Sequence, residues 1–179
     1  MSTQATFDIA FRPLRSDDLP LLARWLAQPH WQEWWGEPEA EVEIIRAMVE
    51  GRDPCRPYLF TVDGEPTGYL QLWRVELNLD PDSLAASPWM AEVAADAVGV
   101  DLSIGDADKL SRGIGSAALR RFARMLWAQD NRTILIDPHP DNLRAVAAYR
   151  KAGFSPVPHL EGRTPGVLIM QFQQDDASP

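Results

Sequence analysis

The stretch VGVDLSIGDADKLSRGIGSAAL, residues 98–119, decides the fold. Its first residues alternate as a strand does, Gly113 and Gly115 punctuate the turn that follows, and an amphipathic helix completes it. Glycine lets a backbone approach an anion closely, and the free N–H groups of a first helical turn favour phosphate. The residues fit neither a P-loop nor a dinucleotide fingerprint. The stretch therefore predicts either a pyrophosphate cradle of another kind or an ordinary tight strand-to-helix turn.

A second stretch, TILIDPHPDNLRAVAAYRKAGF at residues 133–154, has a related layout. It predicts a buried strand, a proline-rich turn, a helix that begins near Asp141 or Asn142, and a C-cap at Gly153. Strands that come first in hairpins and then alternate with helices predict a mixed α/β sheet in three layers.

Together the two stretches resemble the GNAT superfamily of acyl-CoA-dependent N-acetyltransferases, and within it the aminoglycoside 6'-N-acetyltransferases. The resemblance runs from about residue 11 to about residue 172. Besides the two stretches, it rests on Glu33-Trp34-Trp35-Gly36, Gly64-Glu65-Pro66-Thr67-Gly68-Tyr69, Gly99-Val100-Asp101 and the run from Asp137 to Val146. It implies an α/β GNAT fold: a mixed, mostly antiparallel central sheet, splayed between its fourth and fifth strands, with helices on both faces.

Length and patterning are consistent with that fold. A chain of 179 residues predicts one domain over residues 1–179, with an ordered core of about 7–173 and a frayed tail QQDDASP. Strands are expected at 7–15, 58–62, 67–75, 97–104, 133–137, 154–159 and 166–173. Helices are expected from about 16 to 28 and at 38–49, 114–128 and 142–152, and a partly helical loop at 76–95.

Composition narrows the function classes. The net charge of −9 argues against a nucleic-acid partner and favours cationic ones, although an acidic surface also simply keeps a protein soluble. The single Cys55 cannot form an internal disulfide, and the first residues show no secretory signal. No apolar run is long enough to span a bilayer. We expect a cytoplasmic protein with no membrane partner, as a monomer or dimer.

The resemblance also implies a coenzyme site. Acetyl-CoA would be the co-substrate, its pyrophosphate bound by the segment from Leu110 to Gly115 and its thioester carbonyl polarised by a backbone N–H between Leu102 and Ile104. The expected coenzyme-binding residues are Leu102, Ser103, Ile104, Lys109, Leu110, Ser111, Arg112, Gly113, Ile114, Gly115, Ser116, Asn142 and Ala145.

Acetyl transfer to an amine needs a group that accepts the amine proton and a donor for the leaving thiolate. Asp101, a carboxylate on an otherwise apolar strand, is the expected base or amine anchor. Asp137 either adds a second carboxylate for a polycation or caps its turn. Tyr149 matches the family's tyrosine acid, and the alternative is a packed ring with its hydroxyl at the surface.

Aromatic residues suggest a wall for a sugar ring that carries ammonium groups. One side would consist of Trp31, Trp34 and Trp35 with Glu33, and Trp89 of the 76–95 loop would form the other. Core packing is the alternative reading of any single tryptophan.

No metal is expected, because His30, His139, His159 and Cys55 lack metal-ligand spacing. The leading hypothesis is direct transfer of acetyl to the 6'-amine of an aminoglycoside antibiotic, and hence antibiotic resistance. The alternatives are a siderophore-precursor N-acyltransferase, a branch that typically has His where this chain has Asp101, and a non-catalytic acyl-CoA-binding module.

Overall fold

The computed structural model describes residues 7–174, in two compact units. The first unit contains the chain up to Leu70 together with Leu102–Ala118, and the second contains Gln71–Asp101 and the chain from Leu119 onward. Three elements pass from one unit to the other. The expected frayed tail lies outside the described residues from 175 onward, and the expectation of a single domain stays a prediction.

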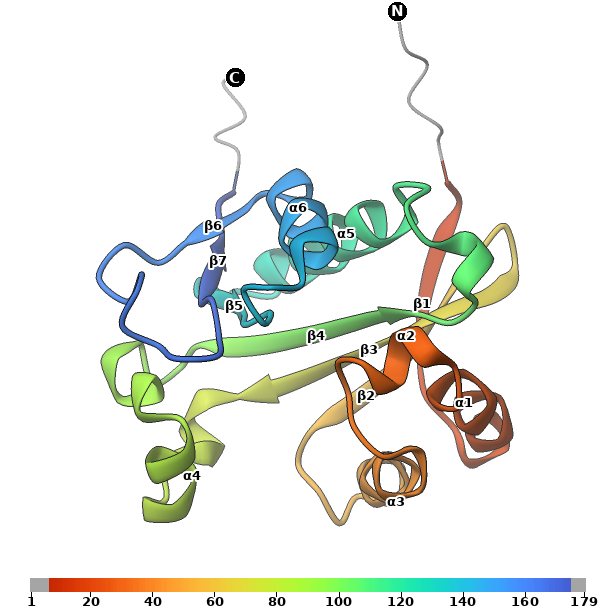
Figure 1. Ribbon diagram of the computed structural model, residues 1–179, viewed down its shortest axis with the longest axis horizontal. Coiled ribbons are helices and arrows are strands. Elements are labelled where there is room, and N and C mark those ends of the chain that lie inside the picture. Colours follow the sequence, from red (N-terminus) through yellow and green to blue (C-terminus); the bar gives the residue numbers. More distant parts are fainter. Residues whose placement is uncertain (1–6, 175–179) are drawn as a thin grey trace, which may run out of the picture. The chain divides into compact units, whose positions relative to one another are not determined.

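Seven strands are hydrogen-bonded in the order β1-β2-β3-β4-β5-β7-β6. The pairs given by β1 with β2, β5 with β7 and β6 with β7 are antiparallel, whereas β4 and β5 are parallel. This mixed, mostly antiparallel sheet confirms the expected α/β GNAT fold (Figure 1). The strands are β1 (Ile9–Pro13), β2 (Arg56–Val62), β3 (Glu65–Arg74), β4 (Val98–Ile104), β5 (Ile134–Ile136), β6 (Phe154–Pro156) and β7 (Met170–Phe172).

The turn between β2 and β3 shows why these residues form a hairpin. Asp63 and Gly64 both have positive φ, 51° and 83°, as a two-residue hairpin turn of type I' requires. Asp and Gly are the residues that adopt this conformation most readily. The Asp63-Gly64 dipeptide therefore fixes the hairpin that the sequence predicts.

The helices of the first unit surround one apolar cluster. It includes Leu22, Trp25 and Leu26 from one helix face, Ile45 from a second helix and Leu59 from β2. Figure 1 shows α1, α2 and α3 grouped on one side of β2. The bounds are η1 (Ser16–Asp18), α1 (Leu19–Leu26), α2 (Pro29–Gln32), α3 (Pro38–Val49) and η4 (Ala107–Lys109).

The second unit has its own apolar cluster, which includes Val75, Trp89, Leu135, Leu160 and Ile169. The expected loop at 76–95 is indeed partly helical, and the two closing strands are shorter than expected. The helices are η2 (Val75–Asn78), α4 (Pro81–Ala86), η3 (Pro88–Glu92) and α6 (Leu143–Ala152), while α5 (Ile114–Ala128) runs through both units.

One detail differs from the sequence-based expectation. The first helix ends at Leu26, and Pro29 opens the short helix α2 rather than closing the preceding one. Proline suits the first position of a helix because its missing N–H would have no partner there.

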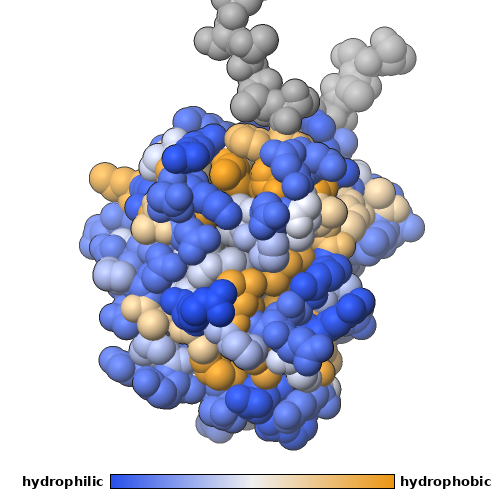
Figure 2. All heavy atoms as spheres, turned by 90° about the vertical axis from the view of Figure 1, so that its right-hand side faces the viewer, coloured by the Kyte–Doolittle hydropathy of each residue, from blue (hydrophilic) through white to orange (hydrophobic). Residues whose placement is uncertain are grey.

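Hydrophilic residues cover most of the face drawn in Figure 2, with apolar residues visible between them.

Candidate active site

Two carboxylates, those of Asp101 and Asp137, are brought together in the second unit. Asp101 projects from β4, and Asp137 directly follows β5. The pairing of these strands joins Val98 to Ile134 and Gly99 to Leu135, and then it ends although β4 continues. Each carboxylate thus comes just beyond the paired residues, and the charge of Asp101 acts directly on Asp137.

Asp101 is held by donors from the neighbouring strand β3. Gln71 donates from Nε2 to Oδ2 of Asp101 at 2.8 Å, and Trp73 donates a second hydrogen bond. A Cβ atom on Gly99 would lie 2.0 Å from the Trp73 ring, so glycine is needed for the indole to lie there. Gln71 and Trp73 are two residues apart and therefore share one face of β3.

The two carboxyl groups cannot readily ionise together. Burial raises the pKa of Asp101, while the donors Gln71 and Trp73 oppose that rise. Burial and the negative charge of Asp101 raise the pKa of Asp137 to about 8. Near neutral pH the pair therefore holds a proton between its members, and a bound cation would release it by stabilising both charges.

Tyr149 lies beside this pair. It is buried on α6 and only 8% exposed. Burial, and then the charges of Asp101 and Asp137, raise the pKa of its hydroxyl, whereas Arg144 lowers it. The phenol consequently keeps its proton at neutral pH, which is the state that a hydrogen-bond or proton donor requires.

The expected phosphate cradle occupies the first unit, between η4 and α5. Ser111 and Gly113 have φ of 60° and 81°, so the chain turns sharply before the helix starts at Ile114. Ser116 and Ala117 both donate to the Gly113 carbonyl, which fixes the start of the helix. A Cβ atom on Gly113 would meet no protein atom within 4 Å, so the space beside this glycine is open.

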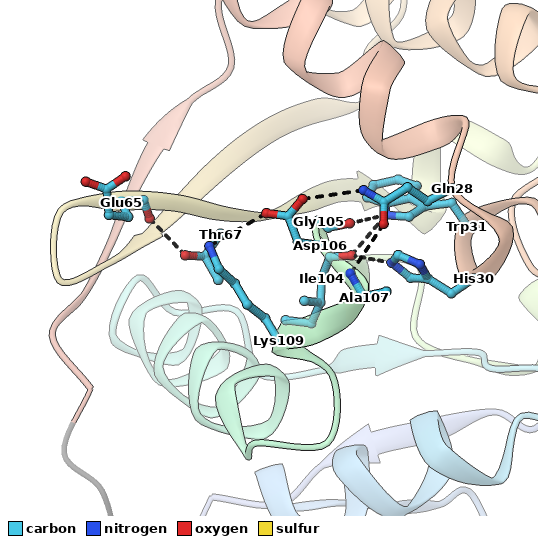
Figure 3. Close-up of polar contacts among 10 residues, drawn as sticks. All are labelled: Gln28, His30, Trp31, Glu65, Thr67, Ile104, Gly105, Asp106, Ala107 and Lys109. Carbon is cyan, nitrogen blue, oxygen red and sulfur yellow. Dashed lines mark hydrogen bonds and ion pairs between the residues drawn. The ribbon is translucent and has the colours of Figure 1, made fainter.

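The end of β4 leads into this cradle and is tied to α2 (Figure 3). Nε2 of His30 and Nε1 of Trp31 lie 3.0 and 2.9 Å from the carbonyl oxygen of Ile104. Gln28 contacts Asp106 and accepts from the backbone N–H of Ala107. The loop from Ile104 to Ala107 is therefore anchored by side chains from a single short segment.

The comparison with known families agrees with this geometry. The acetyltransferase (GNAT) domain family matches residues 15–161, which include both carboxylates, the tyrosine and the cradle. The chain belongs to the GNAT acetyltransferases.

Relatives of this GNAT acetyltransferase include enzymes that act on aminoglycosides. Aminoglycoside N(6')-acetyltransferase type 1 of Klebsiella pneumoniae is 31% identical over 160 residues, which are 85% of this chain and 76% of that protein. The solved structure of aminoglycoside acetyltransferase AAC(6')-Ib with coenzyme A and kanamycin is 30% identical, with a TM-score of 0.75, over 95% of this chain and 96% of the other. A lysine N-acyltransferase of Mycobacterium sp. is 25% identical, over 80% of this chain and 58% of its own length.

The aromatic residues expected to line a substrate wall are mostly occupied in packing. Trp35 packs against the core of the first unit, with its ring 5.6 Å from that of Tyr69, and Trp34 is half-buried while Glu33 is exposed. Trp89 is 5% exposed in the core of the second unit, edge-on to Trp73. The structure therefore gives Trp89 a packing position, while Trp73 contacts Asp101.

Two further residues expected at the coenzyme site, Asn142 and Lys109, lie at the ends of helices. Asn142 uses its side-chain oxygen to accept from the backbone N–H of Ala145 at 3.1 Å, which caps α6. Lys109 lies 3.7 Å from Asp106 in an ion pair at the start of the cradle loop. In both cases the side chain also stabilises the local structure of the GNAT domain.

Sequence reasoning missed Gln71, Trp73 and His30. The first two carry a signal, because Gln71 and Trp73 alternate with leucines on the strand next to the one that bears Asp101. In the sequence, His30 stands out only as one of three histidines without metal-ligand spacing. Its contact with Ile104 joins residues 74 positions apart, which no local pattern encodes.

Residues 7–174 contain neither a cluster of metal-ligating side chains nor a helix suited to crossing a membrane. That part of the chain contains no group of three or more His, Cys, Asp or Glu side chains able to hold a metal ion. None of its helices combines the length and apolar character needed to cross a bilayer.

Proposed function

We propose that this GNAT acetyltransferase transfers the acetyl group of acetyl-CoA to the 6'-amine of an aminoglycoside, by direct attack in a ternary complex. The aminoglycoside N(6')-acetyltransferases among its relatives support the substrate class. The residues present also suit the co-substrate, because the open cradle at Gly113 offers room and free helix N–H groups to a pyrophosphate.

The carboxylate pair is the observation that carries this proposal. Two adjacent, partly buried carboxylates oppose each other's ionisation, so they either hold a proton or bind a cation that stabilises both charges. An aminoglycoside supplies several ammonium groups. Asp101, held by Gln71 and Trp73, is suited to anchor one of them or accept its proton, and Asp137 provides a second charge.

The chemistry follows from these groups. The ammonium group loses one proton to a carboxylate or to a water bound to one, and the nitrogen of the neutral amine attacks the thioester carbonyl carbon. A backbone N–H of Leu102 to Ile104 stabilises the charge that develops on the carbonyl oxygen. The carbon–sulfur bond then breaks, the Tyr149 hydroxyl donates its proton to the thiolate of coenzyme A, and the proton that the new amide nitrogen loses restores the Tyr149 hydroxyl.

Turnover tests the proposal directly. The purified protein is incubated with acetyl-CoA and single amines, and release of free thiol is measured. We expect acetylation of kanamycin and tobramycin but not of analogues with a 6'-hydroxyl. Equal activity on both classes would overturn the 6' assignment, and preference for lysine would favour the N-acyltransferase alternative. Absence of turnover with every amine would leave an acyl-CoA-binding module.

A further inference from the structure

The peptide between Ile104 and Gly105 is held from both sides. On one side, Nε2 of His30 and Nε1 of Trp31 approach the Ile104 carbonyl oxygen at 3.0 and 2.9 Å. On the other, the backbone N–H of Gly105 donates to the Thr67 carbonyl of β3 at 2.8 Å. Figure 3 shows His30 and Trp31 directed at the Ile104 carbonyl from α2, with Nε1 of Trp31 also 3.3 Å from the Gly105 carbonyl oxygen. A carbonyl has two lone pairs, so both acceptor positions of Ile104 are used.

Packing reinforces the same peptide. A Cβ atom on Gly105 would lie 2.1 Å from the ring of Trp25, so the indole lies directly against the backbone. The rings of Trp25 and Trp31 are stacked at 6.5 Å, and Trp31 is fully buried. The strand end therefore lies against a rigid aromatic pair.

His30 is an unusual choice for stability alone. Its Nε2 contacts a carbonyl, which only accepts, so Nε2 must carry the proton. Its Nδ1 is buried and has no hydrogen-bond partner among residues 7–174. A buried polar atom without a partner destabilises a fold, and a phenyl ring would fill the same place without that cost. The donor on Nε2 is thus the feature that phenylalanine would not provide.

The position of the Ile104 carbonyl also shows which edge of β4 the backbone N–H groups of Leu102 and Ile104 face. Within a strand, the N–H and C=O groups of one residue point to the same edge, and those of the next residue point to the opposite edge. The N–H of Gly105 faces β3, so the N–H and C=O groups of Ile104 face away from β3. The N–H groups of Leu102 and Ile104 then share the edge of β4 that faces away from β3. Those are the donors that the proposed function assigns to the thioester carbonyl.

We propose that His30 and Trp31 are positioning residues, which hold the Ile104–Gly105 peptide so that the N–H groups of Leu102 and Ile104 are fixed for polarising the acyl carbonyl. The proposal rests on the proposed function for its chemical consequence. Its structural part, the fixed peptide, does not. Preorganised donors act mainly on the transition state, so their misalignment lowers kcat more than it raises KM.

A double-mutant cycle tests this. His30→Phe and Trp31→Phe each remove one donor while keeping an aromatic ring, and each leaves the other donor in place. We expect each single change to lower kcat by about three- to tenfold, the range for one hydrogen bond. The double variant leaves the Ile104 carbonyl with neither donor, so its loss in kcat should exceed the product of the single losses. The KM for the amine should stay within about twofold.

Two further variants separate positioning from general damage. His30→Gln offers an amide donor to the same carbonyl and should recover part of the kcat lost in His30→Phe. His159 has a similar contact, with Nε2 3.0 Å from the Glu92 carbonyl, so His159→Phe is the matched control and should leave kcat unchanged. An equal loss of kcat in both histidine variants would overturn the proposal, as would an unchanged kcat in the folded double variant.

Hydrogen exchange keeps the test independent of the amine. The Gly105 amide should exchange faster in the double variant than in wild type, without coenzyme or substrate present. If wild type acetylates no amine, the proposed function fails, but this exchange still decides whether the side chains hold the peptide. Unchanged exchange at Gly105 in the double variant would reject the positioning role even if turnover fell.

Discussion

Asp137 lies close enough to Asp101 for the negative charge of Asp101 to raise its pKa. Two partly buried acids this close together, one within β4 and one just after β5, repel each other when both are charged and no cation is bound. A bound ammonium group would stabilise both negative charges, so the pair is suited to bind one. The consequences can be measured with and without substrate.

The first prediction concerns stability and pH. The Asp137 carboxyl has an ordinary pKa of 3.8, and burial with the charge of Asp101 raises its pKa to about 8 in the folded protein. The folded state therefore holds this proton more tightly, so the contribution of Asp137 to the free energy of unfolding is fully present below about pH 4 and is lost as the pH rises through about 8. Asp137→Asn should remove much of this loss. Urea unfolding at pH 5 and pH 9 measures it.

The control for this prediction is Asp141→Asn, which changes an exposed carboxylate four residues away. It should unfold with the same pH dependence as wild type. A fall in stability from pH 5 to pH 9 that is as steep in Asp137→Asn as in wild type would show that the Asp137 proton is not the cause.

Gln71 should matter for amine binding. Its hydrogen bond to Asp101, 2.8 Å long, stabilises the charged carboxylate, and Gln71→Leu removes it. A hydrogen bond to a charged group is worth about 1.5–3 kcal/mol, so we expect the KM for the amine to rise by about tenfold or more. Steady-state kinetics at saturating acetyl-CoA measure this. Gln173→Leu, at an exposed glutamine, is the control, and a matching rise there would contradict the assignment.

Gly113→Asp tests the cradle. The glycine has φ of 81° and an open surrounding, so aspartate places a side chain and a negative charge where the pyrophosphate is expected. We expect the KM for acetyl-CoA to rise by about tenfold or more, with a much smaller change for the amine. Gly162 has a similar φ of 74° and is equally open, so Gly162→Asp has the same strain away from the cradle. A change confined to the amine KM would remove the cradle from the coenzyme site.

Tyr149→Phe deletes the proposed proton donor without changing the ring. General acid catalysis is worth about 10²- to 10⁴-fold, so kcat should fall by at least about 10²-fold while both KM values stay nearly constant. Tyr58→Phe on β2 serves as the matched control. A kcat like that of wild type would leave Tyr149 as a packed aromatic residue.

Gly99→Ala tests the packing that supports Asp101. The added Cβ atom would lie 2.0 Å from the Trp73 ring, which forces the indole or the strand to move. Overpacking of this kind costs about 1–3 kcal/mol, which corresponds to a fall in Tm of about 2–12 °C. Gly115→Ala, whose Cβ would meet Leu102 at an ordinary 3.6 Å, should not lower Tm. Equal Tm values for Gly99→Ala and wild type would mean that the indole can move freely.

The sequence predicted most of the fold because its signals are local. The Asp63-Gly64 turn, the proline that starts α3 and the glycine that ends α6 each act within a few residues. The carboxylate pair was also predictable, since Asp101 interrupts an apolar strand and Asp137 ends the next one. The family resemblance supplied the tyrosine.

The contacts that support the site were not predictable in this way. Gln71 and Asp101 are 30 residues apart, and His30 and Ile104 are 74 apart, so only the folded sheet brings each pair together. Burial of Trp89 likewise depends on which face of its helix meets the core, and a five-residue helix gives too short a period to tell.

The alternation of β4 has a consequence for how this enzyme can change over time. The Asp101 side chain and the backbone donors of Leu102 and Ile104 belong to one strand, in which directions reverse at every residue. The number of residues along β4 therefore determines where each of these groups points. A single-residue insertion after Gly99 would turn the carboxylate to the opposite face, away from Gln71 and Trp73. Substrate range can therefore change through substitutions in the loops and on β3, whereas a residue gained or lost within β4 would move the carboxylate away from its donors.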